Sequence, residues 1–151
     1  MLRANPMAIH RLASRVYHAG VPFVPAFLDA VLFVTCGARV PHGASIGEGS
    51  ILAHGGSGVV IHPKARIGRN VIIHQQVTIG GTGMPGGVPV IEDDVYLGAG
   101  CKILGHLTVG HNSVVGANAV VTRSIPARCV VAGVPARIIR ENVDAHDVET
   151  W

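Results

Sequence analysis

Hydrophobic positions recur every six residues over most of the chain, from Val40 onward. The recurring residue is always a branched aliphatic, with one twelve-residue gap: Ile61, Ile67, Ile73, Ile79, Ile91, Leu97, Ile103, Val109, Val115 and Val121. The fifth position of the same hexads is small or apolar, and glycine follows the aliphatic in half of them. Neither an α-helix nor an alternating strand has this period. The pattern therefore predicts a coil of short segments around an aliphatic interior.

A six-residue repeat with an aliphatic plug and recurrent glycines is typical of a parallel β-helix. The repeat resembles the left-handed β-helix acyltransferases, and the resemblance covers residues 40–138. It implies that three hexads make one triangular coil, with the aliphatic side chain inside and glycines at the corners. We expect an all-β fold with minor α content: a left-handed parallel β-helix of about six coils. One loop, near residues 81–90, is expected to be extruded from it.

Two short helices are expected before the repeat. Asn5-Pro6 can cap and open the first, which ends before Gly20, and Pro25 can start the second, which ends at about Cys36. The second helix is apolar almost all round, so the first helix, the main body or a partner subunit must cover it, with contact to a membrane surface as the alternative. We divide the chain into a helical segment (1–37), a β-helix domain (38–138) and a tail (139–151).

Composition and charge narrow the class of protein. The chain has 151 residues, a net charge of +3, 48% hydrophobic residues and only 4% aromatic residues. One domain with an aliphatic core fits these values, whereas disorder and a nucleic-acid-binding surface do not. Three cysteines without a CxxC pair indicate reduced thiols in a cytoplasmic protein. The apolar stretch 21–36 is too short to span a bilayer, and no secretory signal is visible.

Residues about 18 apart should stack on one face of the β-helix, one strand spacing from each other. One such column runs from Leu52 to Ile73, Leu97 and Val115. Just after these residues come His54, His74 with Gln75, Gly98-Ala99-Gly100 and Gly116-Ala117. Two histidines are thus predicted at one end of a groove lined by small residues. Such a groove admits a thin, extended ligand close to the backbone.

Five segments resemble the serine acetyltransferase family in order and spacing, namely His54–Gly58, Ile61–Ala65, Val77–Gly83, Gly98–Gly105 and Ala132–Arg137. The resemblance implies a short form that lacks the family's large N-terminal helical domain. It implies acetyl transfer from acetyl-CoA to a hydroxyl group, with His54 as catalytic base. His74 is a second catalytic candidate. The cofactor-binding candidates are Gly98, Ala99, Gly100, Gly116, Ala117, Arg123 and Arg137, with the two arginines near the phosphates.

The chain departs from that family at two positions that bear on the acceptor. Family members usually carry an aspartate before the catalytic histidine, where this chain has Ala53, and a histidine in the extruded loop, where residues 81–90 have none. Acetyl transfer therefore stays the prediction, with a serine-like molecule or a sugar as the small-molecule acceptor. A short chain of this kind, opening with a helix pair, also resembles acetyltransferases associated with surface polysaccharide sugars.

Two further classes are the alternatives. His106 and His111 have the spacing of the metal-binding pair in β-helical carbonic anhydrases, but a convincing third ligand is lacking, so no metal is expected. A non-catalytic structural trimer is the other. For the acetyltransferase and for the carbonic-anhydrase-like enzyme, the resemblance implies a homotrimer with sites between subunits. The extruded loop would close such a site. The remaining histidines carry no functional signal: His62 reads as structural, and His10, His18, His42 and His146 point to no role.

Overall fold

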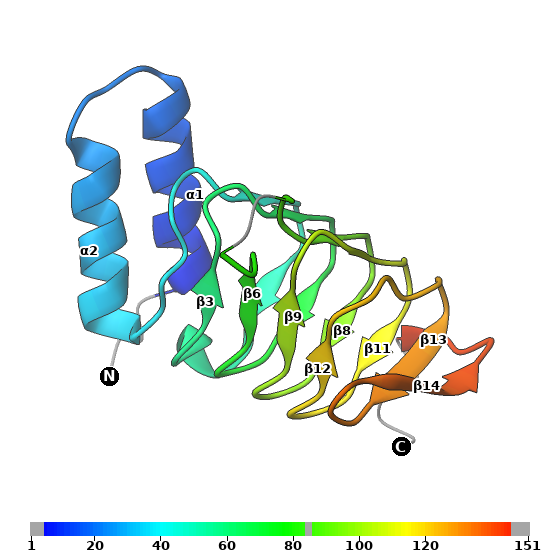
Figure 1. Ribbon diagram of the computed structural model, residues 1–151. Coiled ribbons are helices and arrows are strands. Elements are labelled where there is room, and N and C mark those ends of the chain that lie inside the picture. The colour runs from blue at the N-terminus through cyan, green and yellow to red at the C-terminus, as the bar shows by residue number, and fades with distance from the viewer. Residues whose placement is uncertain (1–4, 84–85, 146–151) are drawn as a thin grey trace.

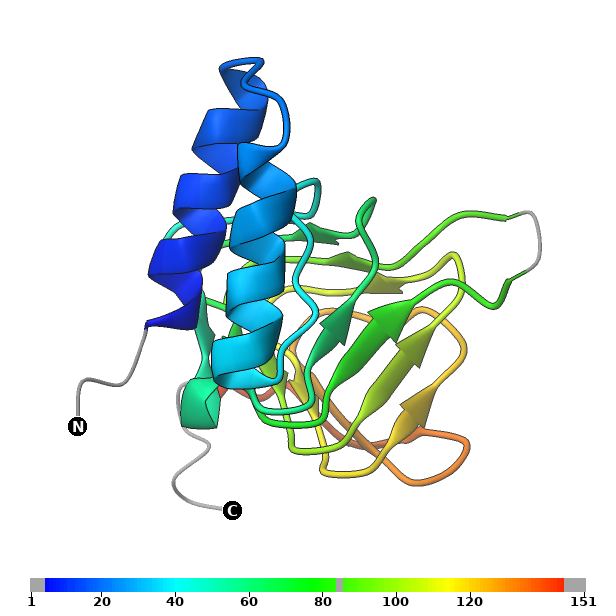
Figure 2. The ribbon, with the colours of Figure 1, turned by 90° about the vertical axis from the view of Figure 1, so that its left-hand side faces the viewer.

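The computed structural model describes residues 5–83 and 86–145. Helices α1 (Pro6–His18) and α2 (Val24–Cys36) pack side by side across one end of a solenoid of short strands (Figures 1 and 2). His146, which carried no predicted role, lies outside the described residues, as do the last residues of the predicted tail. Within the described ranges, neither helix is long and apolar enough to cross a membrane.

The solenoid has three parallel faces, each formed by strands from successive coils. The first face contains β1 (Ser45–Ile46), β4 (Arg66–Ile67), β7 (Val90–Ile91) and β10 (Thr108–Val109). The second contains β2 (Ile51–Leu52), β5 (Ile72–Ile73), β8 (Tyr96–Leu97), β11 (Val114–Val115), β13 (Cys129–Ala132) and β14 (Arg137–Glu141). The third contains β3 (Val60–Ile61), β6 (Thr78–Gly80), β9 (Lys102–Leu104) and β12 (Val120–Val121). The hexapeptide period thus produces the predicted triangular coil.

The number of coils is smaller than the sequence prediction. Strands β1 to β12 make four turns of three strands each, and β13 begins a fifth, so the expectation of about six coils is wrong. Fewer coils form because some residues lie in segments that interrupt the repeat. A 3₁₀ segment, η1 (Ala53–Gly56), lengthens the first coil, and the loop between β6 and β7 projects from the body (Figure 2). After β13 the chain turns back and leaves the repeat, and β14 pairs antiparallel with β13.

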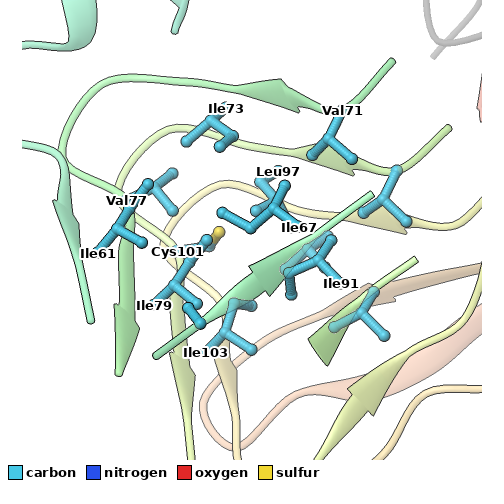
Figure 3. Packing of buried hydrophobic residues seen from close by; sticks show 14 of the residues in the cluster. Ile61, Ile67, Val71, Ile73, Val77, Ile79, Ile91, Leu97, Cys101 and Ile103 are labelled. Atoms are coloured by element: carbon cyan, nitrogen blue, oxygen red, sulfur yellow. The ribbon is translucent and has the colours of Figure 1, made fainter. Parts of the chain in front are cut away.

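The interior consists of stacked aliphatic side chains (Figure 3). All ten residues of the six-residue repeat are buried, none more than 3% exposed. The fifth positions are buried as well, including Cys101 and Ser113, which fill the interior beside the larger side chains. Burying one such Val, Leu or Ile side chain contributes about 1.5–3 kcal/mol. The regular column of these side chains therefore sets the register of all three faces.

The helix ends follow from the residues predicted to make them. The Asn5 side chain accepts hydrogen bonds from the backbone N–H groups of Met7 and Ala8, and Gly37 ends α2 in the left-handed conformation that glycine favours. On α1, Leu12 is about half exposed, whereas Met7 and Ala13 are buried. Apolar side chains of α2 are also exposed, Val34 at 81% and Phe27 at 67%, because α1 covers only one side of that helix.

Candidate active site

The predicted column of stacked residues is present in the structure. Leu52 pairs with Ile73, Ile73 with Leu97 and Leu97 with Val115, and Val115 in turn pairs with Val131. Each of these strands is followed by a corner of the triangular coil. The candidate histidines and small residues therefore line up along one edge of the solenoid, as the register predicted.

His54 projects from this edge because the first coil carries extra residues directly after Leu52. Ile73 follows Leu52 by 21 residues, whereas Val115 follows Leu97 by 18. The extra residues form η1, in which His54 adopts the left-handed conformation (φ 52°, ψ 32°) that few residues other than glycine adopt without strain. Gly56 beside it is buried against Leu52, which anchors the turn. The imidazole of His54 is consequently held outward and exposed.

The structure brings His54 and His74 together. Their ring centroids are 5.6 Å apart and the ring planes are inclined by 48°. His74 follows β5 directly and is half-buried, with its backbone N–H bonded to the carbonyl of Leu97 in the next coil. Ala53 supplies no carboxylate next to His54, so the nearby titratable group that the structure shows is the imidazole of His74.

Tyr96 is a member of this cluster that the sequence analysis missed. Its ring lies 4.8 Å from that of His74, on the side away from β2, because Tyr96 pairs with Ile72 of β5. The signal was present in the sequence: Tyr96 precedes the inward Leu97 and so must point outward on the same face. Gln75 belongs to the same cluster, because its half-buried side chain interacts with the imidazole of His74.

Burial lowers the pKa of His74, and the nearby His54 lowers it further. The unperturbed pKa of histidine is about 6.5, so His74 is neutral at pH 7. A neutral imidazole can accept a proton or donate one from its N–H group. This corner can therefore hold two imidazoles in proximity without requiring both to be charged.

The small residues were predicted to make room for a ligand. Gly98 and Gly116 are also required by the close stacking of the coils. A Cβ atom on Gly98 would lie 2.7 Å from the carbonyl oxygen of Val115 and 2.8 Å from the nitrogen of Ala117. A Cβ atom on Gly116 would lie 3.2 Å from the Cβ of Ala132. Close stacking of the coils thus accounts for both glycines. Binding of a ligand by these two residues, and by Ala99, Gly100 and Ala117, stays a prediction.

Arg123 and Arg137 lie together near the C-terminal end of the solenoid. They line one hollow of about 280 Å³ with Thr122 and Ser124, and both guanidinium groups are on exposed residues. Two arginines and two hydroxyl groups suit the phosphate oxygens of a nucleotide. Four strand spacings, roughly 19 Å, separate β2 near His54 from β13 at this end. A single ligand that contacts both places must span about this distance.

The residues of the metal alternative do not form a centre. His106 and His111 are exposed residues that follow β9 and β10, on different faces of the solenoid, and the backbone N–H of His111 donates to Glu92 at 2.7 Å. Nowhere in residues 5–83 and 86–145 do three His, Cys, Asp or Glu side chains gather as metal ligands would. A hollow of about 590 Å³ over β4 and β7 includes His111 among carboxylates that would repel a phosphate: Glu92, Asp93 and Asp94.

The repeat and the triangular coil define the chain as a left-handed β-helix protein of the hexapeptide-repeat class. The family described as "Bacterial transferase hexapeptide (six repeats)" matches residues 89–123. Within that class the chain is similar in sequence to serine acetyltransferases. It is 38% identical over 135 residues to the serine acetyltransferase of Synechococcus elongatus, covering 88% of this chain and 55% of that protein. The Bacillus subtilis serine acetyltransferase is also 38% identical, with 62% of its length covered.

Solved structures agree with this assignment. The crystal structure of serine acetyltransferase in complex with coenzyme A from Brucella abortus superposes with a TM-score of 0.86 at 37% identity. The match covers 91% of this chain and 56% of that one. The chain thus spans a little over half of the length of these relatives, and the match confirms the left-handed β-helix fold.

Proposed function

We propose that the chain is an O-acetyltransferase that uses acetyl-CoA as co-substrate and acts in the cytoplasm. The observation that carries this proposal is the His54–His74 pair at the start of a column of small corner residues, in a chain homologous to serine acetyltransferases. The neutral state of His74 at pH 7 suits a supporting role, since a neutral imidazole can accept a hydrogen bond from a protonated neighbour.

In the proposed mechanism His54 acts as the general base. As the acceptor oxygen attacks the thioester carbonyl carbon, the His54 imidazole takes the hydroxyl proton, and the C–O bond forms. Collapse of the tetrahedral intermediate breaks the C–S bond, and the imidazolium returns the proton to the departing thiolate of CoA. A base of this kind contributes roughly 10²–10⁴-fold to the rate. Fixed backbone N–H groups at the coil corners can stabilise the oxyanion.

His74 shares this work through its position beside His54. Because the ring of His74 lies between those of His54 and Tyr96, it has little freedom to turn. A fixed neutral imidazole can receive a hydrogen bond from protonated His54 and so orient it during transfer. This role replaces the aspartate that the family pattern places at the position of Ala53.

Coenzyme A is proposed to lie along the column, with its pantetheine arm over Gly98, Ala99, Gly100, Gly116 and Ala117. Its phosphates would meet Arg123 and Arg137 at the C-terminal end. A relative of known structure binds coenzyme A, which supports a coenzyme site in this fold. We further propose a homotrimer with each site shared by two subunits, to which the loop between β6 and β7 contributes. A stable monomer in sedimentation at micromolar concentration would contradict the shared site.

Serine is the first acceptor to test, because the homologues named above are serine acetyltransferases. A sugar hydroxyl is the second candidate, favoured by Ala53 and by the absence of histidine from residues 81–90 of the sequence. A free-thiol assay that follows CoA release would compare serine, homoserine, free sugars and nucleotide-linked sugars. Turnover of serine alone would reject the sugar; turnover of a sugar alone would reject serine.

The mechanism itself is tested by two single variants. His54→Ala should reduce acetyl transfer by about 100-fold or more, because the base acts in the transition state, while CoA affinity measured by calorimetry stays nearly unchanged. His74→Ala should cause a smaller loss and shift the pH–rate profile. His62→Ala is the matched control, since among the described residues its imidazole accepts a hydrogen bond from the nearby backbone N–H of Lys64 and lies outside the His54–His74 cluster. An unchanged rate in His54→Ala would reject the mechanism, and failure to bind CoA would reject the activity.

A further inference from the structure

We propose that a second hollow, between α1 and the first coil, binds a phosphate monoester. We call it the α1 hollow. It has a volume of about 560 Å³ and is lined by His10, Arg11, Ser14, Arg15 and His18 of α1 and by Gly43, Ala44, Ser45 and Ile46 of the segment that leads into β1. None of these residues belongs to the proposed active site, so this inference does not depend on the proposed function.

The charge of the α1 hollow is positive. Arg11, Arg15 and His18 are spaced by four and three residues, which places them on one face of the helix. No carboxylate is among the lining residues, and in the part of the chain that the structure describes neither arginine forms an ion pair. The planar guanidinium group offers a fork of donors that matches phosphate oxygens. Two such groups in one hollow therefore favour an anion with several oxygens.

Carboxylates near the hollow leave this charge in place. Asp29 is the nearest on α2, but it accepts hydrogen bonds from the backbone N–H and from the Nδ1 atom of His42, the latter at 2.7 Å. Glu48 and Arg11 both line a neighbouring hollow. Within the described residues the two side chains are too far apart to form a salt bridge. Arg15 has no such competitor, so it is the side chain on which the test should concentrate.

His10 forms a buried polar part of the wall of the hollow. It is only 2% exposed, and the backbone groups of Val40 and Ala44 lie within hydrogen-bonding reach of its imidazole. Its role is therefore to shape the wall, and the contacts to a ligand fall to the exposed arginines and to the hydroxyl groups. Ser14 and Ser45 supply hydroxyl groups from opposite walls, one from α1 and one from β1.

The size of the α1 hollow favours a phosphate ester over free phosphate. Small-molecule sites have volumes of about 300–1,000 Å³, and this hollow lies well inside that range. The organic part of the ester can come from a soluble metabolite or from a phospholipid, whose headgroup has the same chemistry. The charge of the hollow does not distinguish the soluble metabolite from the phospholipid. The tip of the helix hairpin exposes apolar side chains, including Val21 and Phe23, which a membrane surface could contact. The test must therefore separate the two sources.

The experiment uses the full chain at constant ionic strength. Calorimetry with inorganic phosphate and with glucose 6-phosphate tests the soluble source, and sedimentation with phosphatidylcholine vesicles with and without phosphatidic acid tests the lipid source. We expect one arm to show binding, and Arg15→Gln to weaken it at least tenfold. Arg128→Gln, which removes the same charge from an exposed position between β12 and β13, at the other end of the solenoid, should leave binding within twofold.

Arg15→Lys separates recognition of phosphate from attraction by charge alone. A forked contact predicts that lysine restores only part of the affinity, because an ammonium group cannot bind two oxygens in the same plane. Since Arg15 is exposed, each variant is expected to fold, and a thermal melt would verify it. Absence of binding in both arms at millimolar ester or lipid would overturn the proposal. Equal binding by wild type and Arg15→Gln would place the phosphate elsewhere and overturn it too.

Discussion

Gly98→Ala distinguishes a glycine needed for coil stacking from one needed for a ligand. The added Cβ would lie 2.7 Å from the Val115 carbonyl oxygen and 2.8 Å from the Ala117 nitrogen, both backbone atoms of the next coil. The hydrogen bond from Gly98 N–H to that same carbonyl, at 2.8 Å, holds the two coils at this spacing. The coils must therefore move apart locally, and overpacking of this kind costs about 1–3 kcal/mol.

A loss of that size lowers the melting temperature by roughly 2–12 °C in a chain of this length, at about 2–4 °C per kcal/mol. Gly80→Ala is the matched control, because a Cβ atom there meets nothing within 4 Å. That variant should melt at or slightly above the wild-type temperature. Scanning calorimetry at one protein concentration measures both, and calorimetric titration with CoA follows on the folded variants. Unchanged melting of Gly98→Ala with lost CoA affinity would refute the stacking argument.

Three further results are expected. Asp29→Asn should lower the free energy of unfolding by about 1–3 kcal/mol in denaturant melts, since the carboxylate joins α2 to His42; an unchanged midpoint would show that the contact adds nothing. Burial lowers the pKa of His10, so the unfolded chain binds more protons below about pH 6.5 and stability should fall there, less so in His10→Phe; parallel pH curves would refute this. Burial raises the pKa of Cys101 to about 12, so a thiol reagent at pH 8 should label it only upon unfolding, as peptide mass spectrometry can verify.

The period of six was sufficient to predict the strands, the interior and the face on which the histidines stack. Each aliphatic residue, such as Ile73 or Leu97, marks an inward-facing position, and this fixes which residues of successive coils pair. The number of coils was not predictable in the same way, since η1 and the loop after β6 interrupt the repeat without a fixed length. The return of β14 onto β13 depends on pairing after the repeat has ended.

The candidate site was predictable in outline for the same reason. His54 and His74 follow residues of known register, so their proximity could be worked out from spacing. Tyr96 was not predicted, because the prediction for that coil used only the small residues that follow Leu97. The outward strand position lies just before Leu97. The α1 hollow could not be predicted, because the packing angle of α1 on the first coil is set by contacts between side chains far apart in the chain.

The antiparallel return of β14 has a consequence for how the molecules behave in concentrated solution. A solenoid of parallel strands ends in unpaired backbone groups to which another molecule could add a strand, the step that begins fibre growth. Here β14 covers the end of the face that carries β13, and its own sequence, Arg-Ile-Ile-Arg-Glu, places charged side chains along the new outer edge. Charge on an edge strand discourages further pairing. The last described strand thus acts as a stop to polymerisation, at the end of the molecule opposite the helices.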